Sequence, residues 1–378
     1  MMKDKTAPRF IGSEIYRNSS YGRLHPLAIP RVSTCMDLCR ALGWLPDEVY
    51  VDSPRATPAQ LARFHQPDYI AAVKQAEQTQ HCSDEVKQRY ALGMNGNPVF
   101  PEIFSRPATA CGASIAAADW VLNDIPVHSP AGGTHHGRRG HASGFCYFND
   151  PVLGILSLLD RGAASVFYLD IDAHHGDGVQ DAFHDDERVF TLSIHEANRW
   201  PMNRNDAATG PGSLVDRASG HARNIPVPEG FNDSEFAFLM EAAVLPLIER
   251  VAPEVIVLQC GADALHEDPL SRLSLSNLSL WNTVANMKLV TRKLLVLGGG
   301  GYNPWCVARA WSGVWATLNG LDVPDYLPAQ ARAILSSLTW RHSWGRNPPE
   351  HWIDRLADRP RYGAVRAEIR SAAQTVLS

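Results

Sequence analysis

The sequence lacks the features that direct a chain to a membrane, to nucleic acid or into the secretory pathway. Its 378 residues contain no run of about 18 apolar residues, so no membrane-spanning helix is expected. The opening residues, MMKDKTAPRF, lack the apolar segment of a signal peptide. The net charge is −5, so neither nucleic acid nor an anionic membrane is expected as the main partner. These absences predict a cytoplasmic location.

Paired cysteine motifs are also absent. The seven cysteines are an odd number, and no C-x-x-C pair occurs. A thiolate zinc site needs closer clustering than this. Several cysteines lie in apolar runs, as Cys260 does after Leu258 and Gln259. We therefore expect buried free thiols in a reducing compartment.

Short apolar runs that end in polar or glycine-rich turns are the dominant pattern. Four of them occupy residues 166–172, 189–195, 255–260 and 294–297. Continuous apolar strands are typical of a parallel sheet buried on both faces. Helical apolar spacing appears over 151–161 and 234–251, with Ser234 or Asp233 as the start of the second helix. The pattern predicts an open α/β sheet with helices on both faces.

The remaining segments are two long polar loops and a tail. The loops cover residues 12–30 and 196–213, and long loops inside compact enzymes are usually functional or mobile. From about residue 320 we expect loops and short helices packed on the domain. Ligands of open α/β sheets collect beyond the carboxyl ends of the strands, so polar residues at those ends are candidates for a site.

Three residues of ligand type follow one apolar strand, at Asp170, Asp172 and His174. They share one face if the strand persists that far, because side chains alternate along a strand. Burying them is costly without a compensating ion or partner. A capped strand end with turn residues is the alternative, although it leaves Asp172 and His174 unexplained.

A second strand end supplies Asp263, which alone could equally be a helix N-cap. Together, Asp172, His174 and Asp263 offer two carboxylates and one imidazole, which balance the charge of a divalent cation. Three protein ligands leave one position open for water, as in catalytic zinc sites. The sequence therefore predicts a catalytic metal site at this edge of the sheet.

Two further motifs carry polar groups suited to catalysis. His135 and His136 lie between glycines, and histidine exchanges protons near neutral pH, although a plain polar loop is the alternative. Asp170 and Asp177 could orient these rings through a ring N–H. Four glycines precede Tyr302 in a pattern that matches neither phosphate-binding glycine motif. A loop that presents a phenol donor to an oxyanion is the favoured interpretation.

The motifs THHG, SGFCYFND, YLDIDAHHGDGVQDAF, QCGADAL and GGGGYN occur in this order. In this respect the sequence resembles the histone deacetylase family, which includes acetoin-utilisation proteins and acetylpolyamine amidohydrolases. The resemblance covers about residues 10–320. It implies the arginase–deacetylase fold, a three-layer α/β domain with a parallel sheet of about eight strands. We expect a single deacetylase domain over residues 1–378, with its core at about 10–320 and the C-terminal tail packed on it.

The resemblance implies roles for individual residues. It implies one zinc ion held by Asp172, His174 and Asp263. It implies that His136 is the general base and acid, paired with Asp177, that His135 is paired with Asp170, and that Tyr302 polarises the carbonyl. The residues expected to bind substrate are Gly144, Phe145, Trp200, Leu270 and Gly300, and Arg31 is expected beside an internal acetate-release cavity.

The family also binds potassium. The resemblance implies an inner site formed by Asp170, Asp172, His174, Ser193 and Ile194. An outer site is expected at Phe183, Asp186 and Val189.

The sequence departs from the family pattern at two places that contact substrate. Many lysine deacetylases carry a rim aspartate, whereas the matching stretch here is Asn95-Gly96-Asn97-Pro98. The second aromatic wall of the tunnel falls in residues 199–202, where Trp200 is expected and Met202 is the alternative. Both changes bear on the substrate rather than on the chemistry.

The predicted activity is zinc-dependent hydrolysis of an N-acyl amine, with acyl-lysine as the expected substrate and acetate as the expected acid product. An acetylpolyamine or another small amide is the alternative substrate. One polyamine-specific lineage has a glutamate where this chain has Leu270, although Glu267 and Asp268 lie nearby.

Two other functions are possible on this fold. The related binuclear manganese ureohydrolases need D-x-H-x-D and a later D-x-D, whereas His174 is followed by His175-Gly176-Asp177 and Asp263 by Ala264-Leu265. A non-catalytic binding protein on this fold is expected to lose a ligand, a histidine or the tyrosine, and none is lost.

Overall fold

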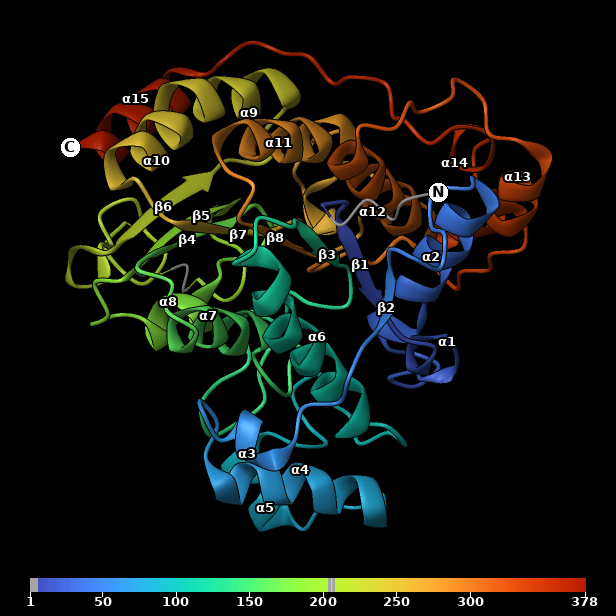
Figure 1. Cartoon of the computed structure of the whole chain (residues 1–378), viewed down its shortest axis with the longest axis vertical. Coiled ribbons are helices and arrows are strands. Elements are labelled where there is room, and N and C mark those ends of the chain that lie inside the picture. Colours follow the sequence, from blue (N-terminus) through green and yellow to red (C-terminus); the bar gives the residue numbers. More distant parts are fainter. Residues whose placement is uncertain (1–5, 203–204, 206–207) are drawn as a thin grey trace.

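The computed structural model describes residues 6–202, 205 and 208–378. In this part of the chain, eight strands form one parallel sheet in the order β2-β1-β3-β8-β7-β4-β5-β6 (Figure 1). The strands are β1 (Arg9–Gly12), β2 (Tyr50–Asp52), β3 (Val127–Ser129), β4 (Val166–Asp170), β5 (Val189–Glu196), β6 (Ala222–Val227), β7 (Val255–Gln259) and β8 (Leu294–Leu297). The predicted α/β class and the parallel sheet are confirmed.

Helices cover both faces of the sheet (Figure 1). One layer contains α6 (Ser105–Val121), α7 (Asp150–Asp160) and α8 (Asp177–Ala182). The other contains α9 (Asp233–Leu239), α10 (Leu245–Val251), α11 (Asn277–Val290) and α12 (Pro304–Asn319), with α2 (Val32–Ala41) beside α12. Strand β7 shows why both layers are needed: Val255 and Val257 pack in one apolar cluster, and Ile256 and Leu258 pack in the other.

A smaller group of helices extends from one end of the molecule. It comprises α3 (Pro58–Leu61), α4 (Pro67–Thr79) and α5 (Asp84–Tyr90), at the bottom of Figure 1. These helices share a third apolar cluster with Tyr147, Phe148 and Tyr302. The group therefore packs against the segments that carry the site.

Two predicted strands end earlier than expected, and this corrects one argument. β4 ends at Asp170 and β7 at Gln259. Asp172 and His174 therefore lie in the loop between β4 and α8, and strand alternation does not place them. Their position depends on the hydrogen bonds of that loop, in which Asp170 Oδ1 accepts the backbone N–H of Asp172 at 3.1 Å.

The start of the predicted 234–251 helix also needs correction. Its N-cap is Asn232, whose side chain accepts the backbone N–H groups of Ser234 and Glu235, while Glu235 bonds back to the Asn232 N–H. Asp233 instead binds Ser276 of a neighbouring segment. A π-helical turn, Met240–Val244, separates α9 from α10.

The tail beyond α12 contains α13 (Ala329–Ser336), α14 (His351–Asp354) and α15 (Ala367–Leu377), and α15 packs against β6. All seven cysteines are buried and free, as predicted. The chain start considered for a signal peptide includes residues 1–5, and the 196–213 loop includes 203–204 and 206–207. These positions lie outside the described residues. The described part of the 12–30 segment contains two short helical turns, α1 (Ile15–Asn18) and Pro26–Ala28.

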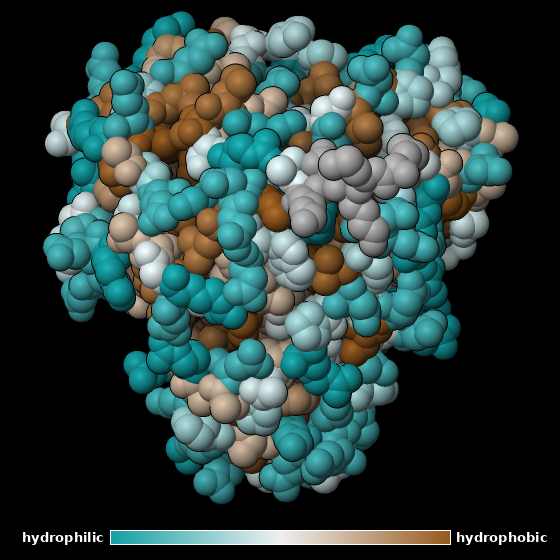
Figure 2. Space-filling model, viewed as in Figure 1, coloured by the Kyte–Doolittle hydropathy of each residue, from teal (hydrophilic) through white to brown (hydrophobic). Residues whose placement is uncertain are grey.

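The surface is mixed in character. On the face drawn in Figure 2, hydrophilic residues predominate, and an apolar area lies at the upper left, over the region of α9 and α10. Within the described residues, no helix combines the length and apolar character needed to cross a bilayer.

Candidate metal centre and active site

Asp172, His174 and Asp263 converge at the carboxyl ends of β4 and β7. One ligand atom from each residue lies within 4.8 Å of the others. Nδ1 of His174 lies 2.9 Å from Asp263 Oδ2 and 3.4 Å from Asp172 Oδ1. Asp263 sits in a 3₁₀ turn, Ala262–Ala264, and accepts the backbone N–H of Ala173 at 3.1 Å rather than capping a helix. The structure thus brings together the three predicted ligands.

The chemistry of this set fits a divalent cation. Both carboxylates are buried, and such groups are costly to bury side by side without a positive charge. Burial opposes protonation of His174, yet its hydrogen bonds to Asp172 and Asp263 raise its pKa to about 10. A metal ion with open coordination can supply the positive charge that these groups attract.

Glycine at position 300 is required by the close packing around the carboxylates. Its backbone N–H donates to Asp172 Oδ2 at 2.6 Å. A Cβ atom added there would lie 2.0 Å from Asp263 Oδ2, so any side chain would displace a ligand. The role expected for Gly300 in substrate binding therefore accompanies a structural role at the metal site.

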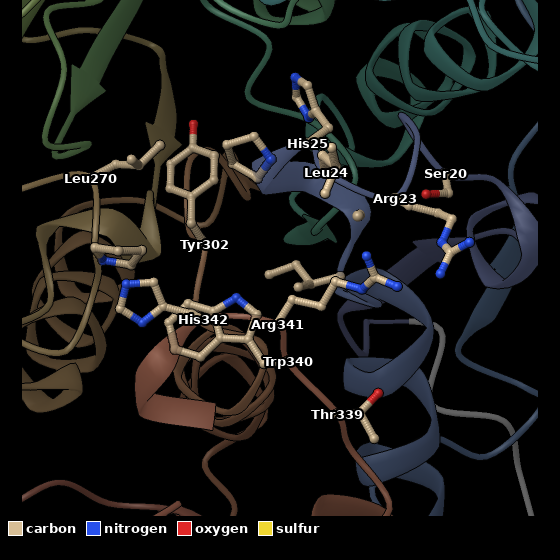
Figure 3. A pocket seen from close by; sticks show the side chains of 14 residues that line it. Ser20, Arg23, Leu24, His25, Leu270, Tyr302, Thr339, Trp340, Arg341 and His342 are labelled. Carbon is tan, nitrogen blue, oxygen red and sulfur yellow. The ribbon is translucent and has the colours of Figure 1, made fainter. Parts of the chain in front are cut away.

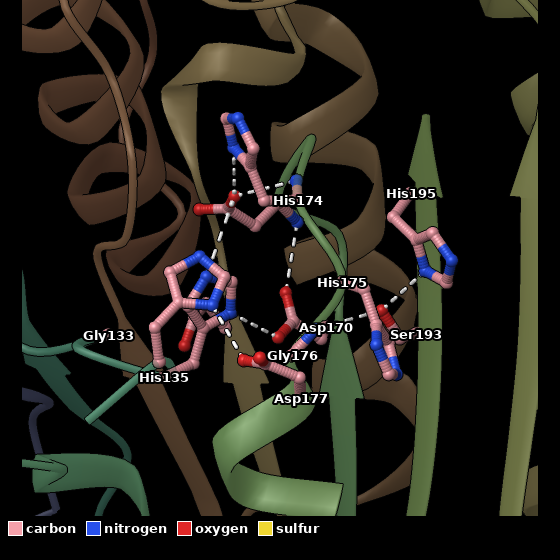
Figure 4. A network of polar contacts seen from close by, with 12 residues as sticks. Gly133, His135, Asp170, His174, His175, Gly176, Asp177, Ser193 and His195 are labelled. Carbon is pink, nitrogen blue, oxygen red and sulfur yellow. Dashed lines mark hydrogen bonds and ion pairs between the residues drawn. The ribbon is translucent and has the colours of Figure 1, made fainter. Parts of the chain in front are cut away.

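Each of the two histidines contacts the aspartate predicted for it. His135 Nδ1 lies 2.7 Å from Asp170 Oδ2 (Figure 4). His136 Nδ1 lies 2.7 Å from Asp177 Oδ1. Asp170 ends β4 and Asp177 begins α8, so the sheet edge and the helix start fix both rings. With Nδ1 hydrogen-bonded to a carboxylate, Nε2 is the acceptor atom of such a ring whenever the ring is neutral.

The two rings differ in pKa although their centroids are only 3.9 Å apart. Burial opposes protonation of His135, but the carboxylates of Asp170 and Asp172 raise its pKa to about 9. Burial and the charge of His135 lower the pKa of His136 to about 3. His136 is therefore the neutral ring, which is the form that can accept a proton.

Residues of the SGFCYFND motif hold the histidine loop in place. Asn149 Nδ2 donates to the carbonyl oxygens of His135 at 3.2 Å and of Gly137 at 2.9 Å. Asp150 Oδ1 accepts the backbone N–H groups of Gly133 and Thr134 at 2.9 and 2.8 Å. The side chains of Asn149 and Asp150 are fully buried, so water does not compete for the hydrogen bonds that hold the loop.

Tyr302 follows the glycine loop and is held at its backbone. Its N–H donates to Asp268 Oδ2 at 2.6 Å, and Asp268 Oδ1 accepts the N–H of Leu270 at 2.9 Å. Burial and the charge of Asp263 raise the pKa of Asp268 to about 8. Burial also raises the pKa of Tyr302, so the phenol keeps its proton and remains a hydrogen-bond donor.

An entrance cavity of about 660 Å³ leads to this centre. His136, His174 and Tyr302 lie among its lining, together with the predicted substrate residues Gly144, Phe145, Trp200 and Leu270. The Trp200 ring is half exposed and lies 4.6 Å from the His136 ring, whereas Met202 is buried. Asn95 and Asn97 line the entrance at the stretch that matches the rim aspartate of many lysine deacetylases.

Glu267 and Asp268, the two acidic residues close to Leu270 in the sequence, point away from this entrance. Glu267 accepts a hydrogen bond from the Trp352 ring N–H at 2.5 Å and lies 3.1 Å from His351 Nε2. Asp268 is 2% exposed and engaged by the two backbone N–H groups. Neither carboxylate is therefore free to attract a substrate ammonium.

Arg31 lines a small cavity of about 40 Å³. This cavity reaches the metal site, because Asp172, His174 and Tyr302 line it as well. Arg31 Nη1 donates to the Gly299 carbonyl at 2.7 Å, and its buried Nε has no partner within the described residues. Burial lowers the pKa of this guanidinium.

The candidate potassium residues occupy two places. At the inner one, Asp170 pairs with Ser193 across β4 and β5, and Ser193 Oγ lies 2.8 Å from His195 Nδ1 (Figure 4). Ile194 follows on β5. At the outer one, a turn brings Phe183, Asp186 and Val189 together through backbone hydrogen bonds of 3.1 and 3.0 Å.

Two polar groups of the site were not singled out from the sequence. Arg138 forms ion pairs with both Asp177 and Asp181. The Tyr168 hydroxyl donates to Asp170 Oδ2 at 2.8 Å. Tyr168 precedes Asp170 by two positions on β4, so strand alternation could have indicated that the two share a face. The sequence carried no such signal for Arg138, because its partners lie about 40 positions away in the chain.

Comparison with known proteins agrees with this geometry. Residues 25–318 match the model of the histone deacetylase domain. The chain belongs to the histone deacetylase family. It is 34% identical to the acetoin utilization protein AcuC of Bacillus subtilis (strain 168) over 334 residues, which are 85% of this chain and 84% of AcuC.

Solved structures of the family match over almost the whole chain. The crystal structure of an HDAC homologue from Aquifex aeolicus has a TM-score of 0.91 and 34% identity, covering 99% of this chain and 100% of the other. The crystal structure of an HDAC homologue complexed with SAHA has the same score and identity, covering 98% and 100%. The predicted arginase–deacetylase fold is confirmed. The chain is thus a hydrolase of the histone deacetylase type, with a three-residue metal site at Asp172, His174 and Asp263.

Proposed function

We propose that this enzyme is a zinc-dependent deacylase that hydrolyses acyl-lysine to lysine and a carboxylate, with acetate as the expected product. The observation that carries the proposal is the meeting of three groups at one cavity. His174 of the metal-ligand set, the neutral His136 and Tyr302 all line the entrance cavity, and Asp172 and Asp263 lie directly behind His174. Amide hydrolysis needs an electrophilic centre, a base for water and a donor for the developing oxyanion.

Asp172, His174 and Asp263 would hold the zinc ion, whose chemistry there is Lewis acidity toward the amide carbonyl and the attacking water. His136, tethered to Asp177, accepts the proton of that water at Nε2 and returns a proton to the leaving amine. Tyr302 donates a hydrogen bond from its hydroxyl to the carbonyl oxygen as negative charge develops. His135, tethered to Asp170, contributes positive charge beside His136.

The entrance supports acyl-lysine over more cationic substrates. Phe145 and Trp200 offer aromatic walls for the four-carbon stem of lysine, and Leu270 adds apolar contact. The Phe145 and Tyr302 rings lie 6.1 Å apart, so the stem would lead toward the hydroxyl of Tyr302. Gly144, at φ +52°, could not carry a side chain, since its Cβ would lie 2.4 Å from the Trp200 ring and 2.6 Å from the His136 ring.

Three further assignments belong to this proposal. Arg31 would hold the released acetate in the small cavity beside the metal site through its unpartnered Nε. Potassium would bind at the inner and outer residues through their carbonyl and carboxylate oxygens. A higher Tm in potassium than in sodium at equal ionic strength would support the potassium sites, because a ligand of the folded state stabilises it. The chain would act as a single deacetylase domain.

The deciding experiment measures bound metal and turnover together. The zinc-loaded protein is offered acetyl-lysine peptides, acetylpolyamines and small amides, and the metal-stripped protein is the control. Turnover of the peptides that disappears on stripping and returns with zinc supports the proposal. A protein that holds zinc but turns over no amide would contradict it and favour a binding role on this fold.

A further inference from the structure

A second cavity, of about 810 Å³, adjoins the entrance cavity. It lies between the loop of residues 20–29, the turn at 269–270 and the tail segment 339–342 (Figure 3). Leu270 and Tyr302 line both cavities, so they form the wall that the two share. A substrate bound through its acyl-amine therefore has a neighbouring chamber beside its remaining part.

The lining of this chamber is basic. Arg23 comes from the loop and Arg341 from the tail, and the two side chains extend toward one another in Figure 3. None of the described residues that line the chamber is acidic. Within the described part of the chain, neither guanidinium has an ion pair or hydrogen bond. Two guanidinium groups that share a space without a counter-charge attract a carboxylate or another oxyanion.

The chamber also has apolar walls, which a lone ion would not use. Trp340 and His342 stack with their rings 4.5 Å apart, and Pro26 and Ile29 lie on the opposite loop. Such surfaces suit the backbone and the side-chain stems of a peptide. The combination of apolar walls and paired arginines fits an extended chain that carries a carboxylate.

We propose that this chamber is a substrate subsite that binds an acidic side chain next to the acyl-lysine of a peptide or protein. The proposal rests on the acyl-lysine activity proposed above. With the acyl-lysine in the entrance cavity, the neighbouring residues pass over Leu270, and a glutamate or aspartate reaches Arg23 and Arg341. The tail thereby contributes to specificity, although Arg341 is far from the motifs of the catalytic centre in sequence.

The test compares kcat/KM for three acetyl-lysine peptides that differ only in flanking glutamate, glutamine or lysine. We expect the glutamate peptide to exceed the glutamine peptide by about threefold to tenfold, the size that one or two partly exposed ion pairs give. The advantage should shrink as salt is raised. The double variant Arg23→Glu/Arg341→Glu should prefer the lysine peptide. The ratio of the peptides is the readout, so a general loss of activity cancels.

Arg332→Glu is the matched control, because Arg332 is an exposed arginine of the tail outside the chamber, and it should keep the wild-type ratio. Equal values for the glutamate and glutamine peptides, with clear turnover of both, overturn the subsite and leave the deacylase activity standing. No turnover of any acyl-lysine peptide overturns the proposed function and the subsite with it. Free acetyl-lysine and its C-terminal amide are compared in the same assay. If kcat/KM favours the acid only in this pair and not among the peptides, the peptide subsite is also overturned, because the chamber would then select a small acid.

Discussion

The carboxyl group of Asp268 joins the backbone N–H of Tyr302, at 2.6 Å, to that of Leu270, at 2.9 Å. One buried side chain thus fixes the loop that carries the phenol and the residue on the wall of the entrance. Glycines precede Tyr302, and Gly301 has a φ of +137°, so the loop backbone has little intrinsic restraint of its own. We infer that Asp268 is a positioning residue for Tyr302.

Asp268→Asn tests this relationship. Asparagine keeps one oxygen and replaces the other with an NH₂ group that cannot accept, so one of the two N–H groups loses its partner. We expect kcat to fall by about tenfold to 100-fold with zinc retained, because small displacements of a reacting group carry costs of this size. The informative measurement is the same substitution in a Tyr302→Phe background, where it should have little further effect on kcat. Equal losses in both backgrounds would mean that Asp268 stabilises the fold without acting through Tyr302.

How much could be predicted from the sequence depended on whether a feature is local. The ligand types at Asp172, His174 and Asp263 followed from the strand-end motifs, and the pairing of each histidine with its aspartate was implied by the resemblance to the family. The end of β4 at Asp170 could not be predicted in this way, because hydrogen bonds within the following loop determine where the strand ends. Asn232 was missed as a cap because Asp233 and Ser234 are equally good cap residues, and tertiary contacts engage Asp233 instead.

Features made by distant segments could not be read from the sequence. The basic chamber joins residues 20–29 to 339–342, which are more than 300 positions apart, and the tail carries no motif that indicates this. The orientation of Glu267 was open for the same reason, since Trp352 and His351 of the tail decide it. Local patterns thus predicted the catalytic centre, and the surroundings that select substrate required the fold.

The metal ligands give a direct prediction. Asp263→Asn removes a charged ligand from a three-residue site. Loss of a residue that only hydrogen-bonds to a metal ligand costs up to about 100-fold in metal affinity, so we expect zinc affinity to fall by at least that much. Turnover should be abolished at stoichiometric zinc. Zinc titration and turnover measure the two effects, with Asp160→Asn, an exposed aspartate on α7, as the control. Wild-type zinc occupancy and rate in Asp263→Asn would refute the ligand assignment.

Tyr302→Phe separates oxyanion stabilisation from metal binding. The substitution removes one hydroxyl donor and keeps all three ligands, so zinc content should be unchanged while kcat falls by about 10²–10³. Tyr326→Phe is a suitable control because Tyr326 is 59% exposed and lies in the tail. A fall in kcat below about threefold would remove Tyr302 from the mechanism.

The last prediction concerns the preference between acyl-lysine and acetylpolyamines. An acetylated polyamine carries a distant ammonium, which needs a carboxylate near the pocket mouth. Leu270 offers apolar contact there, Glu267 is bound to Trp352 and His351, and Asp268 is held by two backbone N–H groups. We therefore expect kcat/KM to be higher for an acetyl-lysine peptide than for acetylspermidine or acetylputrescine, and the ratio of these values measures the specificity.

Leu270→Glu should lower the ratio of kcat/KM for the peptide to that for the polyamine, because it places a negative charge at the wall of the entrance. Leu289→Glu, at an 88% exposed leucine on α11, is the control. If acetylpolyamines are preferred by tenfold or more in the wild type, about 1.4 kcal/mol, the argument from Leu270 is wrong.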